Sequence, residues 1–238
     1  MKKIKIKETK IKKNEIKAIL FDLDNTLIDF LRMKHMAIEE AVVAMIDAGL
    51  IINKKEAVGI IFELYKEKGM EDQEIFQKFL IKTMGKIDIR MIAKATLAYR
   101  RVRDGFLSPY PRVRQTLHEL KLKKFKLAIV TDAPQMNAWM RLCSMHIDHL
   151  FDAVITFDDT KEQKPSPAPF KKAMELLQLK PNQCLMVGDW PERDIIGAKN
   201  LGMKTCFAKY GCSREIAKHG ADFEIEKFED LLEIVKEK

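Results

Sequence analysis

The chain has 238 residues, of which 47% are hydrophobic and 33% are charged, and its formal net charge is +8. This length and apolar share suit a globular protein with a substantial core, and they exclude a disordered or fibrous chain. No apolar run approaches the roughly 20 residues that a membrane-spanning helix needs, and no apolar segment follows the lysine-rich start that could serve as a secretory signal.

The positive charge is concentrated at the start of the chain. Residues 1–17 hold eight lysines and two glutamates, so six of the eight net charges lie there. We therefore interpret residues 1–16 as a basic extension, either a solvated leader or a short edge strand guarded by lysines, and expect no nucleic-acid partner. The four cysteines make neither a CxxC pair nor a disulfide framework, which favours a cytoplasmic setting.

An apolar run over residues 18–21 predicts a buried central strand, and it ends in the polar sequence DLDNT at residues 22–26. From residue 29 to residue 106, apolar residues recur at helical spacing, which predicts about four helices with breaks near Gly49, Gly69 and Gly85. Open α/β sheets bind ligands at the carboxyl ends of their strands. We therefore expect this helical insertion to be a cap that acts as a lid.

Helix and strand patterns alternate after a turn at residues 108–111. The expected helices cover residues 113–123, 134–146, 167–179, 192–201 and 228–235, and the expected strands cover residues 126–131, 153–156, 184–187 and 204–208. This alternation predicts an α/β fold with a Rossmann-like parallel sheet. The core would comprise residues 17–28 and 107–238, with the helical cap at residues 29–106 inserted after the first strand.

Polar side chains follow several of these predicted strands. Asp22 and Asp24 stand two residues apart at the end of the first strand, so they can face the same side. Carboxylates so close repel each other unless a cation or a shared proton accompanies them. Because the carboxyl ends of parallel strands share one edge, we expect a single polar site there: Asp22, Asp24, Thr131, Lys164, Asp189 and Asp194.

These residues resemble the four ordered motifs of the haloacid dehalogenase superfamily of phosphohydrolases. The matching positions are DLDNT at residues 22–26, Thr131, Lys164 and GDWPERD at residues 188–194. The resemblance extends over residues 17–211 and includes an insertion where the family places a small helical cap. Within the superfamily, the sequence is similar to archaeal small-molecule phosphatases, some of them glyceraldehyde 3-phosphate phosphatases, and to phosphoglycolate phosphatases.

The resemblance implies an Mg²⁺-dependent phosphomonoesterase that acts through an aspartyl-phosphate on a small soluble metabolite. Asp22 would be the nucleophile, and Asp24 would be the general acid and base. Asp22, Asp189 and the backbone carbonyl of Asp24 would bind Mg²⁺. Lys164 would hold phosphoryl oxygens and counter the carboxylates, and Asp194 would orient Lys164 or a metal-bound water.

The remaining expected site residues concern the substrate. Thr131 and the backbone N–H groups of Asp132 and Asn25 would contact the phosphoryl group. Arg32 and Lys34 follow the nucleophile closely in the chain, so they are candidates for substrate selection. Glyceraldehyde 3-phosphate and phosphoglycolate are the candidate substrates; the preference among Mg²⁺, Mn²⁺ and Co²⁺ and the oligomeric state, monomer or dimer, stay open.

Other functions remain as alternatives. A sugar-phosphate mutase uses the same two aspartates, but mutases carry a histidine at the position that Lys34 occupies here. A phosphonate hydrolase would form a Schiff base with a cap lysine, whereas a solvated side chain is the favoured interpretation for Lys34, Lys54 and Lys55. Dehalogenation is disfavoured because it gives Asp24 no leaving oxygen to protonate. A non-catalytic protein that binds nucleic acid or an acidic partner through residues 1–16 is the last alternative.

Overall fold

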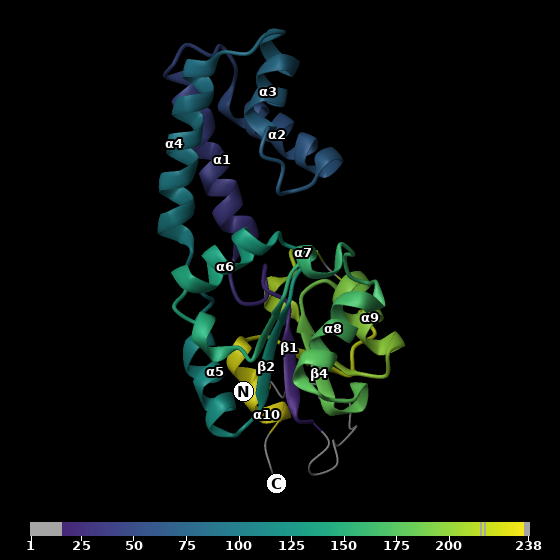
Figure 1. The fold of residues 1–238 in the computed structure, drawn as a ribbon. Coiled ribbons are helices and arrows are strands. Elements are labelled where there is room, and N and C mark those ends of the chain that lie inside the picture. The colour runs from purple at the N-terminus through teal and green to yellow at the C-terminus, as the bar shows by residue number, and fades with distance from the viewer. Residues whose placement is uncertain (1–15, 215, 217, 236–238) are drawn as a thin grey trace. The chain divides into compact units, whose positions relative to one another are not determined.

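The computed structural model describes residues 16–214, 216 and 218–235. The chain forms two compact units (Figure 1): unit 1 comprises Met1–Asp29 and Ser108–Lys238, and unit 2 comprises Phe30–Leu107. The predicted N-terminal extension lies outside the described residues apart from Ile16. Within the described part of the chain, no helix combines the length and the hydrophobicity needed to cross a membrane.

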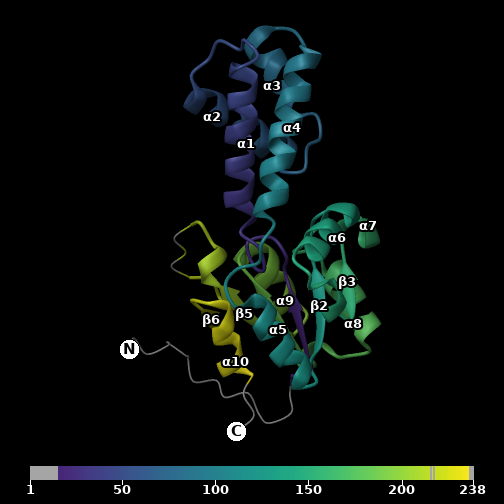
Figure 2. The ribbon, with the colours of Figure 1, turned by 90° about the vertical axis from the view of Figure 1, so that its left-hand side faces the viewer.

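The described residues of unit 1 form a six-stranded sheet in the order β3-β2-β1-β4-β5-β6 (Figure 2), and every neighbouring pair is parallel. The register pairs Phe21 of β1 with Ile129 of β2 and with Val187 of β4, so these three strands end at the same edge. The predicted α/β fold is thereby confirmed. The strands are β1 (Ala18–Phe21), β2 (Lys126–Val130), β3 (Ala153–Ile155), β4 (Cys184–Gly188), β5 (Lys204–Ala208) and β6 (Phe223–Ile225).

Helices cover both faces of this sheet (Figure 1). Leu20 packs in one cluster with Phe170 of α8, whereas the ring of Phe21 lies 5.6 Å from that of Phe228 on the opposite face. Because successive residues of β1 enter different cores, its sequence is apolar throughout. The helices of unit 1 are α5 (Val113–Leu122), α6 (Gln135–Ser144), α7 (Phe157–Thr160), α8 (Pro167–Leu177), α9 (Ile196–Asn200) and α10 (Leu231–Ile234).

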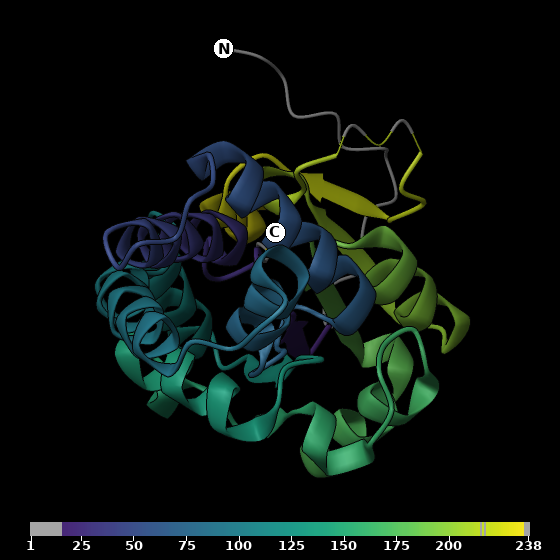
Figure 3. The same ribbon diagram turned by 90° about the horizontal axis from the view of Figure 1, so that it is seen from above.

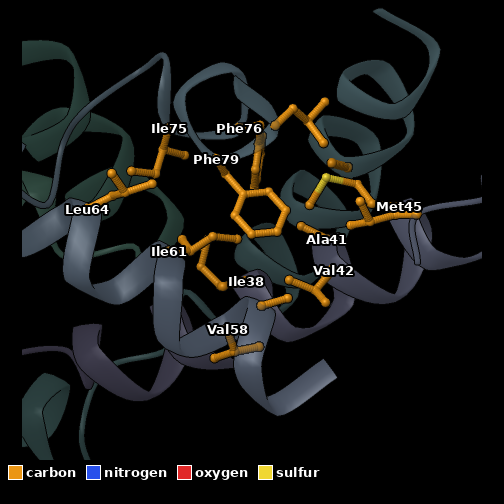
Figure 4. Packing of buried hydrophobic residues seen from close by; sticks show 14 of the residues in the cluster. Ile38, Ala41, Val42, Met45, Val58, Ile61, Leu64, Ile75, Phe76 and Phe79 are labelled. Atoms are coloured by element: carbon orange, nitrogen blue, oxygen red, sulfur yellow. The ribbon is translucent and has the colours of Figure 1, made fainter. Parts of the chain in front are cut away.

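Unit 2 consists of the four predicted helices: α1 (Phe30–Ile46), α2 (Lys54–Lys68), α3 (Ile75–Met84) and α4 (Ile89–Phe106). Helices α1 and α4 run side by side, and Figure 3 views them nearly along their axes. A shared apolar cluster, with Phe79 fully buried in it, joins α1, α2 and α3 (Figure 4). Asn53 and Asp88 cap α2 and α4 by accepting hydrogen bonds from backbone N–H groups.

The shortest elements differ from the sequence-based expectation. Strand β6 was not predicted, and neither was the one-turn helix α7. The predicted helix at residues 192–201 begins with a π-helical turn, Pro191–Ile195, and continues as α9. Both unpredicted segments are short and are interrupted by acidic residues, so they lack the wholly apolar run by which the equally short strands β1 and β3 were predicted.

Candidate active site

The nucleophile candidate, Asp22, directly follows β1 at the carboxyl edge of the sheet. Its backbone N–H donates to the carbonyl of Val187 at 2.9 Å, which continues the pairing of β1 with β4 by one residue. The loop then turns at Asn25, whose φ of 60° is in the left-handed region that asparagine tolerates well. The backbone N–H of Asn25 donates to Ile28 at 2.7 Å. This N–H therefore has an acceptor within the loop, and its expected contact with the phosphoryl group stays a prediction.

Lys164 is the centre of the polar cluster, and its side chain is 2% exposed. Its ammonium donates to Asp22 Oδ1 at 2.5 Å, to Asp194 Oδ1 at 2.7 Å and to the carbonyl of Val130 at 2.9 Å. An ammonium has three protons, so these contacts use all of them. Burial works against the charge of Lys164, but the carboxylates of Asp194 and Asp22 outweigh it and the pKa of Lys164 is raised. The lysine is a fixed cation that links three strand ends.

Three buried carboxylates, from Asp22, Asp189 and Asp194, have ligand oxygens within 4.8 Å of one another. Burial raises the pKa of Asp22 to about 8, with Lys164 opposing this shift and Asp194 adding to it. Burial also raises the pKa of Asp189 to about 9, and repulsion from Asp22 and Asp194 contributes. With one ammonium among three carboxylates, the ionised group would carry two excess negative charges. Because Mg²⁺ prefers carboxylate oxygens and balances this charge, the donor set fits Mg²⁺.

Asp194 has less freedom than the other two carboxylates. Its Oδ1 accepts from Lys164, and its Oδ2 accepts from the backbone N–H of Trp190 at 3.0 Å. Both oxygens therefore hold protein groups in place. This geometry matches the expected task of orienting Lys164, which remains a prediction.

Asp189 is held by contacts that the sequence did not indicate. The hydroxyl of Thr26 donates to Asp189 Oδ1 at 3.2 Å, and the hydroxyl of Tyr210 donates to the carbonyl of Thr26 at 2.6 Å. Gly211 lies so close to the same loop that a Cβ there would be 1.7 Å from the carbonyl oxygen of Asn25. The segment after β5 therefore supports the DLDNT loop. Thr26 is within the motif, but Tyr210 gave no signal in the sequence.

Thr131 and Asp132 follow β2 at the same edge. The Thr131 hydroxyl oxygen accepts from the backbone N–H of Ala133 at 3.2 Å, and the residue is 3% exposed. The carboxylate of Asp132 accepts from the backbone N–H of Lys164 at 2.9 Å and from Arg193 at 3.2 Å. Asp132 thus ties the Lys164 segment to β2. Phosphoryl binding by Thr131 and by the Asp132 N–H stays a prediction.

Asp24, the expected acid and base, forms an ion pair that the sequence did not reveal. Arg141 Nη1 of α6 lies 2.7 Å from Asp24 Oδ2, and the side chains are 6% and 24% exposed, respectively. Arg141 is 117 positions away along the chain. Its only signal in the sequence is that it is the single charged residue in α6.

Arg32 and Lys34 lie in unit 2, on the first helical turns of α1. Arg32 is exposed, so its side chain is accessible to a ligand. Lys34 is buried, with its ammonium 4.4 Å from the ring centroid of Tyr65 and 5.3 Å from that of Tyr99. The expectation of a solvated lysine at this position is therefore wrong. Cation–π attraction offsets part of the cost of removing the ammonium from water.

The chain is similar in sequence to a family of hydrolases and to individual phosphatases. The family of haloacid dehalogenase-like hydrolases matches residues 19–208. A glyceraldehyde 3-phosphate phosphatase of Methanocaldococcus jannaschii is 36% identical over 222 residues, which span 93% of this chain and 97% of that protein. The enzyme of the same name from Pyrococcus furiosus is 34% identical over 224 residues, 93% of each chain.

The fold is shared with solved structures. A predicted phosphoglycolate phosphatase from Haemophilus somnus has a TM-score of 0.68 and 26% identity, covering 93% of this chain and 99% of its own. The superfamily expected from the four motifs is confirmed. The chain belongs to the haloacid dehalogenase-like hydrolases.

Proposed function

We propose that this hydrolase is an Mg²⁺-dependent phosphomonoesterase that acts on a small phosphorylated metabolite through an aspartyl-phosphate. The observation that carries the proposal is the contact of 2.5 Å between Lys164 and Asp22 Oδ1, in a buried cluster that also contains Asp189. A carboxylate held this way beside a fixed cation and a metal-binding carboxylate has the surroundings that attack on a phosphate dianion requires.

Each residue has a defined task in the two chemical steps. An oxygen of Asp22 attacks phosphorus and the bond from phosphorus to the leaving oxygen breaks, while the Asp24 carboxyl gives its proton to that oxygen. The alcohol leaves, and the Asp24 carboxylate then takes a proton from a water whose oxygen attacks phosphorus. The bond from phosphorus to Asp22 breaks, which releases phosphate and restores both aspartates.

The metal and the basic side chains would manage the charge during these steps. Asp22, Asp189 and the backbone carbonyl of Asp24 would hold Mg²⁺, which offsets repulsion between carboxylates and phosphate when it is bound. The Thr131 hydroxyl would contact phosphoryl oxygens, and Lys164 would do so by exchanging one of its three present acceptors for a phosphoryl oxygen. Since Lys164 keeps its charge through its carboxylate neighbours, it can serve in both steps without losing a proton.

The substrate class is part of the proposal. The relatives named glyceraldehyde 3-phosphate phosphatase match nearly the whole chain, which favours a triose phosphate or a similar small ester such as phosphoglycolate. Arg32 and Lys34 of unit 2 remain our candidates for substrate selection. Of these, Arg32 is the exposed side chain, and Lys34 would act by shaping the aromatic cluster around it.

We further propose a cytoplasmic location and a soluble metabolite as the partner. All four cysteines are free thiols, including the exposed Cys143, as is usual for proteins of a reducing compartment. Six of the eight net positive charges lie in residues 1–17, so the globular units offer no strong attraction for nucleic acid.

The test is phosphate release from a panel of phosphomonoesters, with and without Mg²⁺. The panel contains glyceraldehyde 3-phosphate, phosphoglycolate, glycerol 3-phosphate and 4-nitrophenyl phosphate. We expect Mg²⁺-dependent turnover that Asp22→Asn abolishes. Asp104→Asn, at a side chain 62% exposed in unit 2, is the matched control and should retain the activity. Turnover that survives Asp22→Asn, or none on any ester, would contradict the proposed function.

A further inference from the structure

Helix α6 buries its charged residue and exposes large apolar side chains, the reverse of the usual distribution in a globular protein. Its only charged residue, Arg141, is 5% exposed, whereas Met136 is 70% exposed and Trp139 is 39% exposed. Charged side chains are almost never buried without a partner, because removing them from water is costly. Arg141 shares the buried face of α6 with Ala138 and Leu142, and its guanidinium is paired there with the carboxylate of Asp24 at 2.7 Å.

The helix that carries Arg141 is itself fixed at both ends. At its start, the backbone N–H of Gln135 donates to Asp158 Oδ2 at 2.7 Å. At its end, Arg114 Nε donates to the carbonyl of Met145 at 2.8 Å. The guanidinium of Arg141 is thus presented to Asp24 from a rigid element rather than from a loop.

We propose that Arg141 is the positioning residue of the general acid, fixing the Asp24 carboxyl for proton transfer to the leaving oxygen. The inference rests on the proposed function. A guanidinium suits this task because it stays charged, does not exchange protons with the carboxyl, and stabilises the carboxylate that Asp24 becomes once its proton has moved to the leaving oxygen. The bond from phosphorus to the leaving oxygen breaks while the Asp24 proton moves to that oxygen, and Arg141 neither gives nor takes a proton.

This role has a consequence for the substrate class. An alkyl phosphate releases a strongly basic alkoxide, which needs a proton as it leaves, whereas 4-nitrophenyl phosphate releases a stable phenolate that does not. A well-placed general acid typically contributes a factor of roughly 10²–10⁴ in rate. Arg141 therefore equips the enzyme for esters of ordinary alcohols, and its loss should matter in proportion to the basicity of the leaving group.

The experiment compares kcat/KM for glycerol 3-phosphate and for 4-nitrophenyl phosphate in saturating Mg²⁺. This quantity reports on steps up to the first irreversible one, so it isolates formation of the aspartyl-phosphate from its hydrolysis. For Arg141→Met we expect kcat/KM to fall at least roughly tenfold on the alkyl ester and less than about threefold on the aryl ester. Arg141→Lys keeps a cation, so its ratio of kcat/KM on the alkyl ester to kcat/KM on the aryl ester should lie between those of the wild type and Arg141→Met.

Lys121→Met is the matched control, because it removes a cation of unit 1 that pairs with Asp152 and contacts neither α6 nor Asp24. It should change both kcat/KM values by the same factor. If Arg141→Met does not fold, the alkyl-to-aryl ratio of Arg141→Lys against the wild type decides the question. Equal losses on both esters in the Arg141 variants, with an active wild type, would overturn this inference alone. A wild type that Asp22→Asn does not inactivate would instead overturn the proposed function.

Discussion

Gly188 ends β4 one residue before Asp189, and the space left by its absent side chain is filled by Asp194. A Cβ at this position would lie 2.3 Å from Asp194 Oδ2, the oxygen that accepts from the backbone of Trp190. The other oxygen of Asp194 holds Lys164. The glycine therefore allows the carboxylate that fixes the central lysine to approach the sheet.

We expect Gly188→Ala to lower the free energy of unfolding by about 1–3 kcal/mol, because an overpacked site must shift its neighbours. The larger effect should be on catalysis. Displacing Asp194 moves Lys164, and a misplacement of about 1 Å can cost roughly 10²-fold in rate. Urea unfolding followed by tryptophan fluorescence, together with phosphate release, measures both effects.

Gly59→Ala is the control for this substitution. Gly59 lies in α2, where a Cβ would meet nothing within 4 Å, so alanine should be neutral or slightly stabilising there. If Gly188→Ala retained full activity, Asp194 could not be what holds Lys164 in its working position.

At the scale of elements, the turn after β5 acts as a support for the loop after β1. The hydroxyl of Tyr210 donates to the carbonyl of Thr26, and the hydroxyl of Thr26 donates to Asp189. Two segments that are 184 positions apart along the chain are thereby joined beneath the proposed metal site. Since Asp189 would be a metal ligand, this contact couples the position of a loop to metal affinity.

Tyr210→Phe should therefore weaken Mg²⁺ binding as well as stability. Leaving a buried carbonyl without its donor costs about 1–3 kcal/mol in the free energy of unfolding. Tyr210 reaches Asp189 only through Thr26, so the loss in metal affinity should not exceed the roughly 10–100-fold that removing a direct contact to a metal-binding carboxylate typically causes. Direct titration with Mn²⁺, followed by the paramagnetic signal of the free ion, measures affinity independently of turnover.

Tyr110→Phe provides the comparison, because the Tyr110 ring contacts the Tyr210 ring edge to face at 5.0 Å and phenylalanine keeps that contact. We expect its Mn²⁺ affinity to stay close to that of the wild type. An unchanged Mn²⁺ affinity in Tyr210→Phe would show that the turn stabilises the fold without positioning Asp189.

The elements also show which parts of the structure could be predicted from the sequence. Long helices such as α1 and α4 repeat their apolar positions several times, and β1 is short but wholly apolar, so each pattern predicts its element. Strand β6 has three residues and offers no such repetition. Its existence depends on pairing with β5, which is a tertiary effect.

The residues of the candidate site likewise fall into those that could be predicted from the sequence and those that could not. Asp22 and Lys164 lie in motifs whose order along the chain identifies the family, so they could be named in advance. Arg141 and Tyr210 reach the site through partners 117 and 184 positions away, and no local pattern encodes such contacts. Burial of Lys34 was missed for the same reason, because its aromatic neighbours come from other helices of unit 2.

At the scale of the whole molecule, the carboxylate cluster makes the stability of unit 1 depend on pH and on metal. The pKa of Asp22 is raised to about 8 and that of Asp189 to about 9, both by burial first, from an ordinary value of 3.8. A carboxyl whose pKa is higher in the folded state stabilises the fold at low pH, and this contribution is lost as pH rises through the folded pKa. Mg²⁺ binds the ionised carboxylates, so the stabilisation that it provides increases as the pH rises.

We therefore expect the midpoint temperature of unfolding of the metal-free protein to decrease as the pH is raised from 6 to 9. The increase in this temperature that saturating Mg²⁺ causes should become larger over the same pH interval. Both tryptophans, Trp139 and Trp190, lie in unit 1, so thermal unfolding followed by their fluorescence reports on the unit that holds the cluster. Asp189→Asn removes one charge from the cluster and should flatten both trends. If wild type and Asp189→Asn gave parallel pH profiles, with and without Mg²⁺, the cluster would not be the source of the pH dependence.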